Sequence, residues 1–135
     1  MAENNFGDSI KKVIVIGSTG TIGEAVSTLL LNRGFSVIGI GRKVPSFDQK
    51  NENYIHYILD LQNTDLLEVT LSNIVRNHEG IICLVHCAGL GEFSNIENLP
   101  ISKIKAMIDV NLLSVIVSAK VLLPHFKKMD IGKLI

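Results

Sequence analysis

Three evenly spaced glycines are the feature of this 135-residue sequence with the clearest chemical meaning. Gly17, Gly20 and Gly23 follow a short apolar run and open a stretch with helical periodicity. In that context the first glycine permits a tight turn, the second lets backbone N–H groups approach a pyrophosphate, and the third lets a helix pack against a strand. The spacing therefore predicts dinucleotide binding by residues 17–23. The alternative is a turn that serves the fold alone.

Two basic residues, Arg42 and Lys43, follow the next apolar run, where an acidic residue would hold the ribose hydroxyls of NAD. A guanidinium group suits a 2′-phosphate instead, because the two form paired, charge-assisted hydrogen bonds. We therefore expect NADP as the cofactor, with NAD less favoured. In the alternative interpretation, both basic residues belong to a solvated turn.

These residues need a scaffold, and the sequence predicts alternating strands and helices. The continuous apolar run 13–16 is typical of a strand covered on both faces. Residues 35–40, 54–59 and 81–87 are predicted to be the other strands. Apolar residues at helical spacing lie between them, as Ile22, Ala25, Val26, Leu29 and Leu30, and as Leu67, Thr70, Leu71, Ile74 and Val75. The polar segment 43–53 leaves room for a short helix or none. This alternation predicts an α/β fold with a three-layer, doubly wound, Rossmann-like parallel sheet of order 3-2-1-4 and the possible start of a fifth strand.

Residues 102–128 predict a helix of about seven turns, with Pro124 bending its end. Its apolar residues form two stripes, Ile104, Met107, Ile108, Leu112, Val115 and Ala119 in the first and Ile101, Val110, Leu113, Val117 and Val121 in the second. A helix that is apolar on two sides is normally buried on two sides. We expect the second stripe to be left uncovered by the sheet and to form a homodimer contact.

Composition argues against several classes of protein. Thirteen basic and thirteen acidic residues leave no net charge, so a surface for nucleic acid is not expected. Hydrophobic residues make up 47% of the chain and charged residues only 19%, which excludes disorder and implies an apolar surface. No apolar run approaches the roughly 18 residues of a membrane span, and the first residues have no signal-peptide core. We expect a cytoplasmic protein without membrane contact.

The cysteines and histidines predict neither a disulfide nor a metal site. Cys83 and Cys87 lie on one predicted strand, where their Cα atoms would be about 13 Å apart, too far for a disulfide. They are therefore expected to be reduced thiols. The four histidines show no metal-ligand spacing with each other or with the cysteines.

Several motifs together resemble the amino-terminal half of a short-chain dehydrogenase/reductase. In order they are Gly17-Ser18-Thr19-Gly20-Thr21-Ile22-Gly23, Asp60-Leu61, His86-Cys87-Ala88-Gly89, Asp109-Val110-Asn111-Leu112 and Gly132-Lys133-Leu134-Ile135. Each is a modest signal alone, but their order and spacing are specific, and they cover nearly the whole chain.

The resemblance implies roles for individual residues. Residues 17–23 would hold the cofactor pyrophosphate, Asp60 and Leu61 the adenine, and Ala88 and Gly89 the ribose side. Asn111 matches a helix asparagine that orders a water linked to the catalytic lysine. Two alternatives remain: Asp60 as a solvated loop carboxylate, and Asn111 as a partner for a buried backbone group.

The sequence departs from the family pattern in three places. Most members space the glycines as G-x-x-x-G-x-G, and two asparagines are commonest where His86 and Cys87 stand. The family also needs a serine and a Tyr-x-x-x-Lys pair, the tyrosine acting as general acid. Neither tyrosine of this chain, Tyr54 or Tyr57, has a lysine four positions later. We therefore expect residues 1–135 to form an NAD(P)-binding domain truncated before the catalytic residues, inactive on its own.

The sequence leaves three functions open. The first is the NADP-binding part of a reductase that transfers hydride between NADP(H) and a carbonyl or alcohol substrate. The second is a non-catalytic dinucleotide-binding module. The third is an interaction protein that presents the apolar face of the 102–128 helix.

Overall fold

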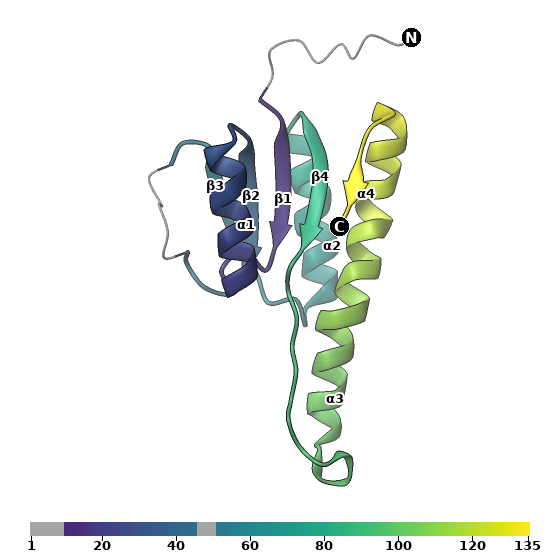
Figure 1. The fold of residues 1–135 in the computed structure, drawn as a ribbon. Helices are drawn as coiled ribbons and strands as arrows, with labels where there is room; N and C mark the ends of the chain where they lie inside the picture. Colours follow the sequence, from purple (N-terminus) through teal and green to yellow (C-terminus); the bar gives the residue numbers. More distant parts are fainter. Residues whose placement is uncertain (1–9, 46–50) are drawn as a thin grey trace.

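The computed structural model describes residues 10–45 and 51–135, which form a single parallel sheet between helices (Figure 1). The first elements are β1 (Lys12–Ile16), α1 (Thr21–Asn32), β2 (Ser36–Gly41), β3 (Tyr54–Ile58), α2 (Thr64–Asn77) and β4 (Ile81–His86). A 3-10 turn η1 (Ile96–Asn98), α3 (Ile101–Ile108), a π-helical turn η2 (Asp109–Leu113), α4 (Ser114–Met129) and β5 (Lys133–Leu134) follow. The strand order β3-β2-β1-β4-β5 confirms the predicted fold class, including the start of a fifth strand.

The sheet has a hydrophobic layer on each face because alternate residues of its central strands point to opposite sides. Ile14, Ile16, Ile38 and Ile40 lie in one buried cluster with residues of α2 and α4. Val13, Val15 and Val37 lie in the other, against α1. A strand buried on both sides must be apolar throughout, which is why β1 and β2 were recognisable as continuous runs.

The bounds of α1 agree with the prediction, but its packing face differs. Gly23 and Ser27 are the buried residues of this helix, whereas Ile22 and Leu29 are 68% and 53% exposed. Small residues on the inner face let the helix axis approach the sheet. Of the predicted stripe, Val26 and Leu30 are partly buried and pack against the core beside them. The prediction of a short or missing helix in 43–53 falls partly on residues 46–50, outside the described residues.

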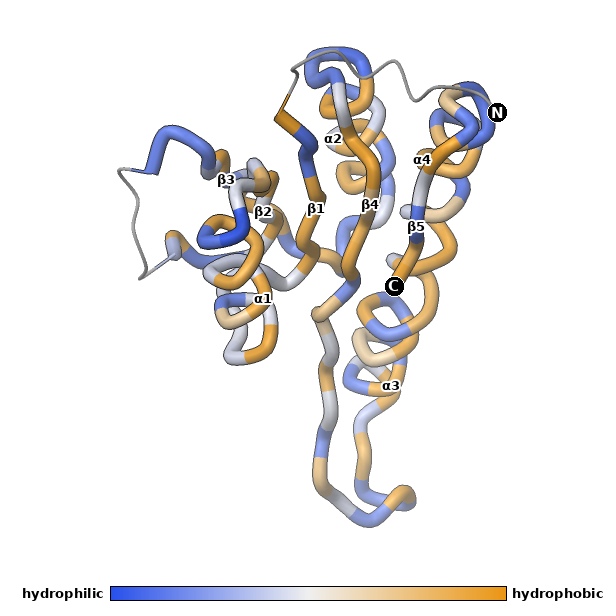
Figure 2. Tube along the Cα trace, turned by 45° about the horizontal axis from the view of Figure 1, so that its top comes forward, coloured by the Kyte–Doolittle hydropathy of each residue, from blue (hydrophilic) through white to orange (hydrophobic). Residues whose placement is uncertain are grey.

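The predicted 102–128 helix is a continuous run from Ile101 to Met129. Of the stripe predicted to be uncovered, Ile101 and Leu113 are exposed, but Val110 is buried. The buried residues recur every fourth position: Ala106, Val110, Ser114, Ser118, Leu122 and Phe126. Val117 and Val121 pack against the core beside them. The exposed apolar face contains Ile108, Leu112, Val115, Ile116 and Leu123. Figure 2 shows that hydrophobic residues recur along the whole of this helix.

Two buried serines explain why the buried face of this helix differs from the predicted one. The Ser114 and Ser118 hydroxyls donate hydrogen bonds of 2.6 and 2.7 Å to the carbonyl oxygens of Val110 and Ser114, one helical turn earlier. Since each polar group is satisfied within the helix, both serines can be buried. A pattern that counts only apolar residues misses such a face.

Among residues 10–45 and 51–135, one helix, Ile101–Met129, is long and apolar enough by length and composition to cross a membrane. This helix is not an uninterrupted apolar run, because isolated polar residues lie within it. In this structure its buried strip packs against α2 and the sheet. Core helices of soluble proteins meet the same criterion.

Candidate functional site

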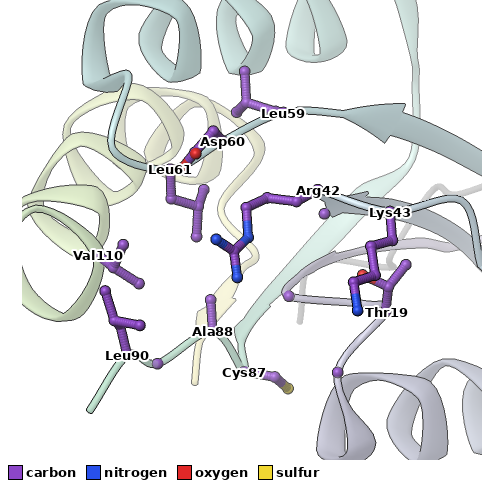
Figure 3. A pocket seen from close by; sticks show the side chains of 14 residues that line it. Thr19, Arg42, Lys43, Leu59, Asp60, Leu61, Cys87, Ala88, Leu90 and Val110 are labelled. Atoms are coloured by element: carbon purple, nitrogen blue, oxygen red, sulfur yellow. The ribbon is translucent and has the colours of Figure 1, made fainter. Parts of the chain in front are cut away.

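A cavity of about 260 Å³ opens where the central strands end, which is where parallel α/β sheets bind ligands (Figure 3). Its walls come from the loops that follow β1, β2, β3 and β4 and from one residue of η2. The lining residues are Gly17, Thr19, Gly20, Gly41, Arg42, Lys43, Leu59, Asp60, Leu61, Cys87, Ala88, Gly89, Leu90 and Val110. Four chain segments distant in sequence thus meet at one edge of the sheet.

Of the three predicted glycines, Gly17 and Gly20 lie in the loop between β1 and α1, and Gly23 lies in the first turn of α1. Gly17 has φ +79°, and a Cβ there would lie 2.6 Å from the backbone nitrogen of Ala88. A Cβ on Gly23 would lie 2.0 Å from the carbonyl oxygen of Gly17. Gly20 makes only an ordinary contact and lines the cavity. The first and last glycines thus allow close packing of the loop, and the middle one leaves the cavity wall without a side chain.

The start of α1 provides the loop with hydrogen-bond donors. The Gly17 and Ser18 N–H groups donate to the carbonyl of Ile40, at 2.7 and 3.2 Å, which fixes the loop on β2. The first helical bond is made by the N–H of Glu24 to Gly20. N–H groups before this point have no intrahelical partner and carry the positive end of the helix dipole. The cavity edge at Gly20 is therefore suited to an anion.

Arg42 and Lys43 bring two cations to the same cavity. In Figure 3 the Arg42 side chain extends toward Leu61 and Ala88, whereas Lys43 extends on the side of Thr19. Asp60 is the only acidic residue among those lining the described cavity. One of its carboxylate oxygens accepts the N–H of Gln62 at 3.0 Å, so Asp60 also closes a turn. The cavity accordingly has a positive balance.

The loop after β4 is held by Asn111, in the π-helical turn of the long helix. Asn111 Oδ1 accepts the N–H of Leu90 and its Nδ2 donates to the Leu90 carbonyl, both at 2.8 Å. The amide therefore pairs with both backbone groups of one residue, as a neighbouring strand would. Asn111 itself does not line the cavity, but it positions Leu90, which does.

His86 supports this wall from the end of β4. Its Nε2 lies 2.8 Å from Ser114 Oγ, and that hydroxyl donates to Val110 beside the π-helical turn. Burial lowers the pKa of His86 below its usual 6.5, with nearby backbone groups acting in the opposite direction. A neutral His86 with hydrogen on Nε2 fits the contact, since the Ser114 hydrogen is already used.

The structure brings most predicted site residues together. Gly17, Thr19, Gly20, Arg42, Asp60, Leu61, Ala88 and Gly89 line the cavity, and Ser18, Thr21, Ile22, Gly23 and Asn111 do not. Ser18 is fully buried behind the loop. Six lining residues were not predicted, namely Gly41, Lys43, Leu59, Cys87, Leu90 and Val110. All six are direct sequence neighbours of predicted site residues, so widening each motif by one residue would have found them.

Both cysteines are free thiols, as the strand spacing predicted. Burial raises the pKa of Cys83 and of Cys87 above the usual 9.0, so neither thiol is activated. Within the described ranges 10–45 and 51–135, no three His, Cys, Asp or Glu residues form a group that could hold a metal ion.

Comparison with known proteins gives a family for most of the chain. Residues 11–135 match the family described as short chain dehydrogenase. A benzil reductase ((S)-benzoin forming) from Bacillus cereus is 28% identical over 134 residues, covering 92% of this chain and 54% of the relative. The chain spans about half the length of the curated relatives it matches.

Solved structures share the fold. A short chain dehydrogenase from Leptospira borgpetersenii with bound NAD⁺ superposes with a TM-score of 0.84 at 22% identity, over 99% of this chain and 54% of the other. ElxO with bound NADP gives a TM-score of 0.83 at 22% identity, over 93% of this chain and 54% of the other.

Proposed function

Since the chain belongs to the short-chain dehydrogenase family, we propose that residues 1–135 form the NAD(P)-binding domain of an oxidoreductase and prefer NADP(H) to NAD(H). The observation that carries this proposal is the cavity itself. It joins the amino-terminal end of α1 to the cations of Arg42 and Lys43 at the carboxyl edge of the sheet. An anionic ligand with phosphates at two places matches that distribution of positive charge.

The residues at the cavity fit a dinucleotide. The pyrophosphate would lie against the loop of residues 17–23, where Gly20 has no side chain to occupy the space. The remaining loop residues Ser18, Thr21, Ile22 and Gly23 would act through their backbone or by packing. Asp60 and Leu61 would contact the adenine, Ala88 and Gly89 the ribose side, and Arg42 the 2′-phosphate.

The chemistry that a bound nicotinamide supplies is hydride transfer between NADP(H) and a carbonyl or alcohol substrate. Within this chain, Asn111 would keep the wall at Leu90 in place and order the water that serves a catalytic lysine. Neither Tyr54 nor Tyr57 is followed by a lysine four positions later, and we propose that residues 1–135 alone do not reduce carbonyl compounds. The two superposed structures carry NADP and NAD⁺, which supports the cofactor class for this fold.

Calorimetric titration of the purified chain with NADPH and with NADH, at one salt concentration, tests this function. We expect both to bind and NADPH to bind more tightly, because only NADPH has a phosphate for Arg42. Binding of neither nucleotide would reject the function and favour the interaction protein. Equal affinities would retain the dinucleotide site but reject the preference for NADP.

We also propose a cytoplasmic location and a homodimer formed through the 102–128 helix. The free thiols of Cys83 and Cys87 are typical of a reducing compartment. For the dimer, the support is the exposed apolar face that contains Ile108, Leu112, Val115, Ile116 and Leu123. Burying several hundred Å² of such a face at roughly 25 cal/mol per Å² favours association.

Charges on the exposed face are expected to convert the dimer into a monomer. Leu112 and Ile116 are 56% and 52% exposed on adjacent turns, so glutamates there can be solvated in the monomer but not in the contact. Light scattering at micromolar concentration on Leu112→Glu/Ile116→Glu is the measurement. Leu29→Glu, at an equally exposed position on α1, is the matched control and should stay dimeric. A monomeric parent chain would contradict the dimer, and a dimer insensitive to both charges would place its contact at β5.

A further inference from the structure

A buried polar cluster lies against Ser18 of the loop of residues 17–23. The Tyr54 hydroxyl of β3 lies 3.1 Å from Ser18 Oγ and 2.9 Å from His56 Nδ1. Ser18 Oγ and His56 Nδ1 are themselves 3.5 Å apart. Tyr54 and Ser18 are both buried, at 9% and 0% exposure. None of the three residues lines the cavity.

Gly39 of β2, the strand between β1 and β3, makes the contact of Tyr54 with Ser18 possible. A Cβ on Gly39 of β2 would lie 2.1 Å from the Tyr54 hydroxyl and 2.6 Å from Ser18 Oγ. Any other residue at position 39 would therefore separate the tyrosine from the serine. The missing side chain lets Tyr54 reach across β2 from β3 to the loop that follows β1.

The Tyr54 hydroxyl bridges Ser18 and His56 through hydrogen bonds. Burial lowers the pKa of His56 below its usual 6.5, while nearby backbone groups of Lys43 and Gly41 act in the opposite direction. His56 is thus neutral at pH 7, with one ring nitrogen donating and the other accepting. With hydrogen on Nε2, Tyr54 donates to His56 and accepts from Ser18; with hydrogen on Nδ1, both directions reverse. In either arrangement, removing the tyrosine hydroxyl removes the two shorter contacts and leaves only the 3.5 Å contact between Ser18 and His56.

We infer that Tyr54 and His56 are positioning residues for the cofactor pyrophosphate, acting through Ser18 on the loop between β1 and α1. This inference rests on the proposed function of that loop. The Ser18 side chain is anchored behind the loop while its neighbours Thr19 and Gly20 line the cavity in front. A displacement of Ser18 would therefore move the groups that meet the pyrophosphate, whereas the Arg42 side chain extends toward Leu61 and Ala88.

The effect on the two cofactors distinguishes this role from that of Arg42. NADPH and NADH share the pyrophosphate and differ in the 2′-phosphate, so Tyr54→Phe should weaken both by the same factor. Loss of one bridging hydrogen bond predicts a weakening of about three- to tenfold. Ser18→Ala should cost a similar factor, and the double variant no more than either single one, because both remove the same contact.

Two substitutions keep the result interpretable. His56→Gln retains a side-chain amide that can pair with Tyr54, and it should bind both nucleotides better than His56→Leu does. Tyr57→Phe is the matched control, because Tyr57 pairs with His78 at 3.2 Å near the end of α2, away from the cavity. It should leave both affinities unchanged.

The experiment is calorimetric titration of the full chain and these variants with NADPH and NADH, alongside amide hydrogen exchange without nucleotide. The exchange follows the Gly17 and Ser18 N–H groups, which bond to Ile40 and should lose protection in Tyr54→Phe but not in Tyr57→Phe. Unchanged affinity in folded Tyr54→Phe, or weakening of NADPH alone, would overturn the inference. If the parent chain binds neither nucleotide, the proposed function fails, and the exchange data alone decide whether the cluster holds the loop.

Discussion

Replacing Gly23 with alanine is expected to lower the free energy of unfolding by about 3 kcal/mol and to abolish dinucleotide binding. The new Cβ would lie 2.0 Å from the Gly17 carbonyl oxygen, 2.7 Å from its carbon and 2.9 Å from the Ser18 Cα. All three are backbone atoms, which cannot move aside as a flexible side chain can. The loop or the start of α1 must therefore shift, and the cavity edge shifts with it.

Urea unfolding and calorimetric titration of Gly23→Ala measure both effects, and two other glycines supply controls. A Cβ on Gly20 would lie 3.5 Å from the Gly17 carbonyl oxygen, an ordinary contact, so Gly20→Ala should nearly retain stability while weakening binding. Gly34 has φ +81° with nothing within 4 Å of a Cβ. Gly34→Ala should therefore show only the cost of a left-handed conformation, about 1 kcal/mol. A Gly23→Ala variant as stable as these two would contradict the close packing of loop and helix.

Removal of the Arg42 side chain is expected to weaken NADPH binding by about 1.5 to 3 kcal/mol while leaving NADH binding nearly unchanged. The guanidinium offers two parallel N–H donors to a phosphate, and the alanine variant offers none. Arg42→Lys keeps the charge but not the paired donors, so its affinity should lie between those of the parent and Arg42→Ala.

Titration of both nucleotides at two salt concentrations checks this expectation. Arg33→Ala removes a guanidinium from the far end of α1 and is the matched control, with no effect on either affinity expected. An equal loss of NADPH and NADH binding in Arg42→Ala would show that Arg42 acts on a part common to both cofactors. If Arg42→Ala binds both nucleotides as tightly as the parent chain, Arg42 is a solvated turn residue.

The pairing of Ser18 with Tyr54 illustrates what local patterns leave out. From the sequence, Ser18 is predicted to belong to a dinucleotide-binding loop, and Tyr54 only to begin a strand. Nothing in their spacing of 36 residues indicates contact. The contact exists because β1, β2 and β3 lie side by side and Gly39 leaves a gap in the middle strand.

The sequence by itself determined the elements and the edge of the sheet at which a ligand would bind. Strands buried on both faces must be continuous apolar runs, a turn with close backbone contacts requires glycine, and parallel strands place their following loops at one edge. Those constraints are local and therefore visible at Gly17, Gly23 and Arg42. Only the tertiary structure decided which face of the long helix is buried, because Ser114 and Ser118 satisfy their hydroxyls within the helix and pack as small residues. It likewise decided that Asn111 pairs with Leu90 and that Tyr54 reaches Ser18, since each contact depends on the distance between segments far apart in the chain.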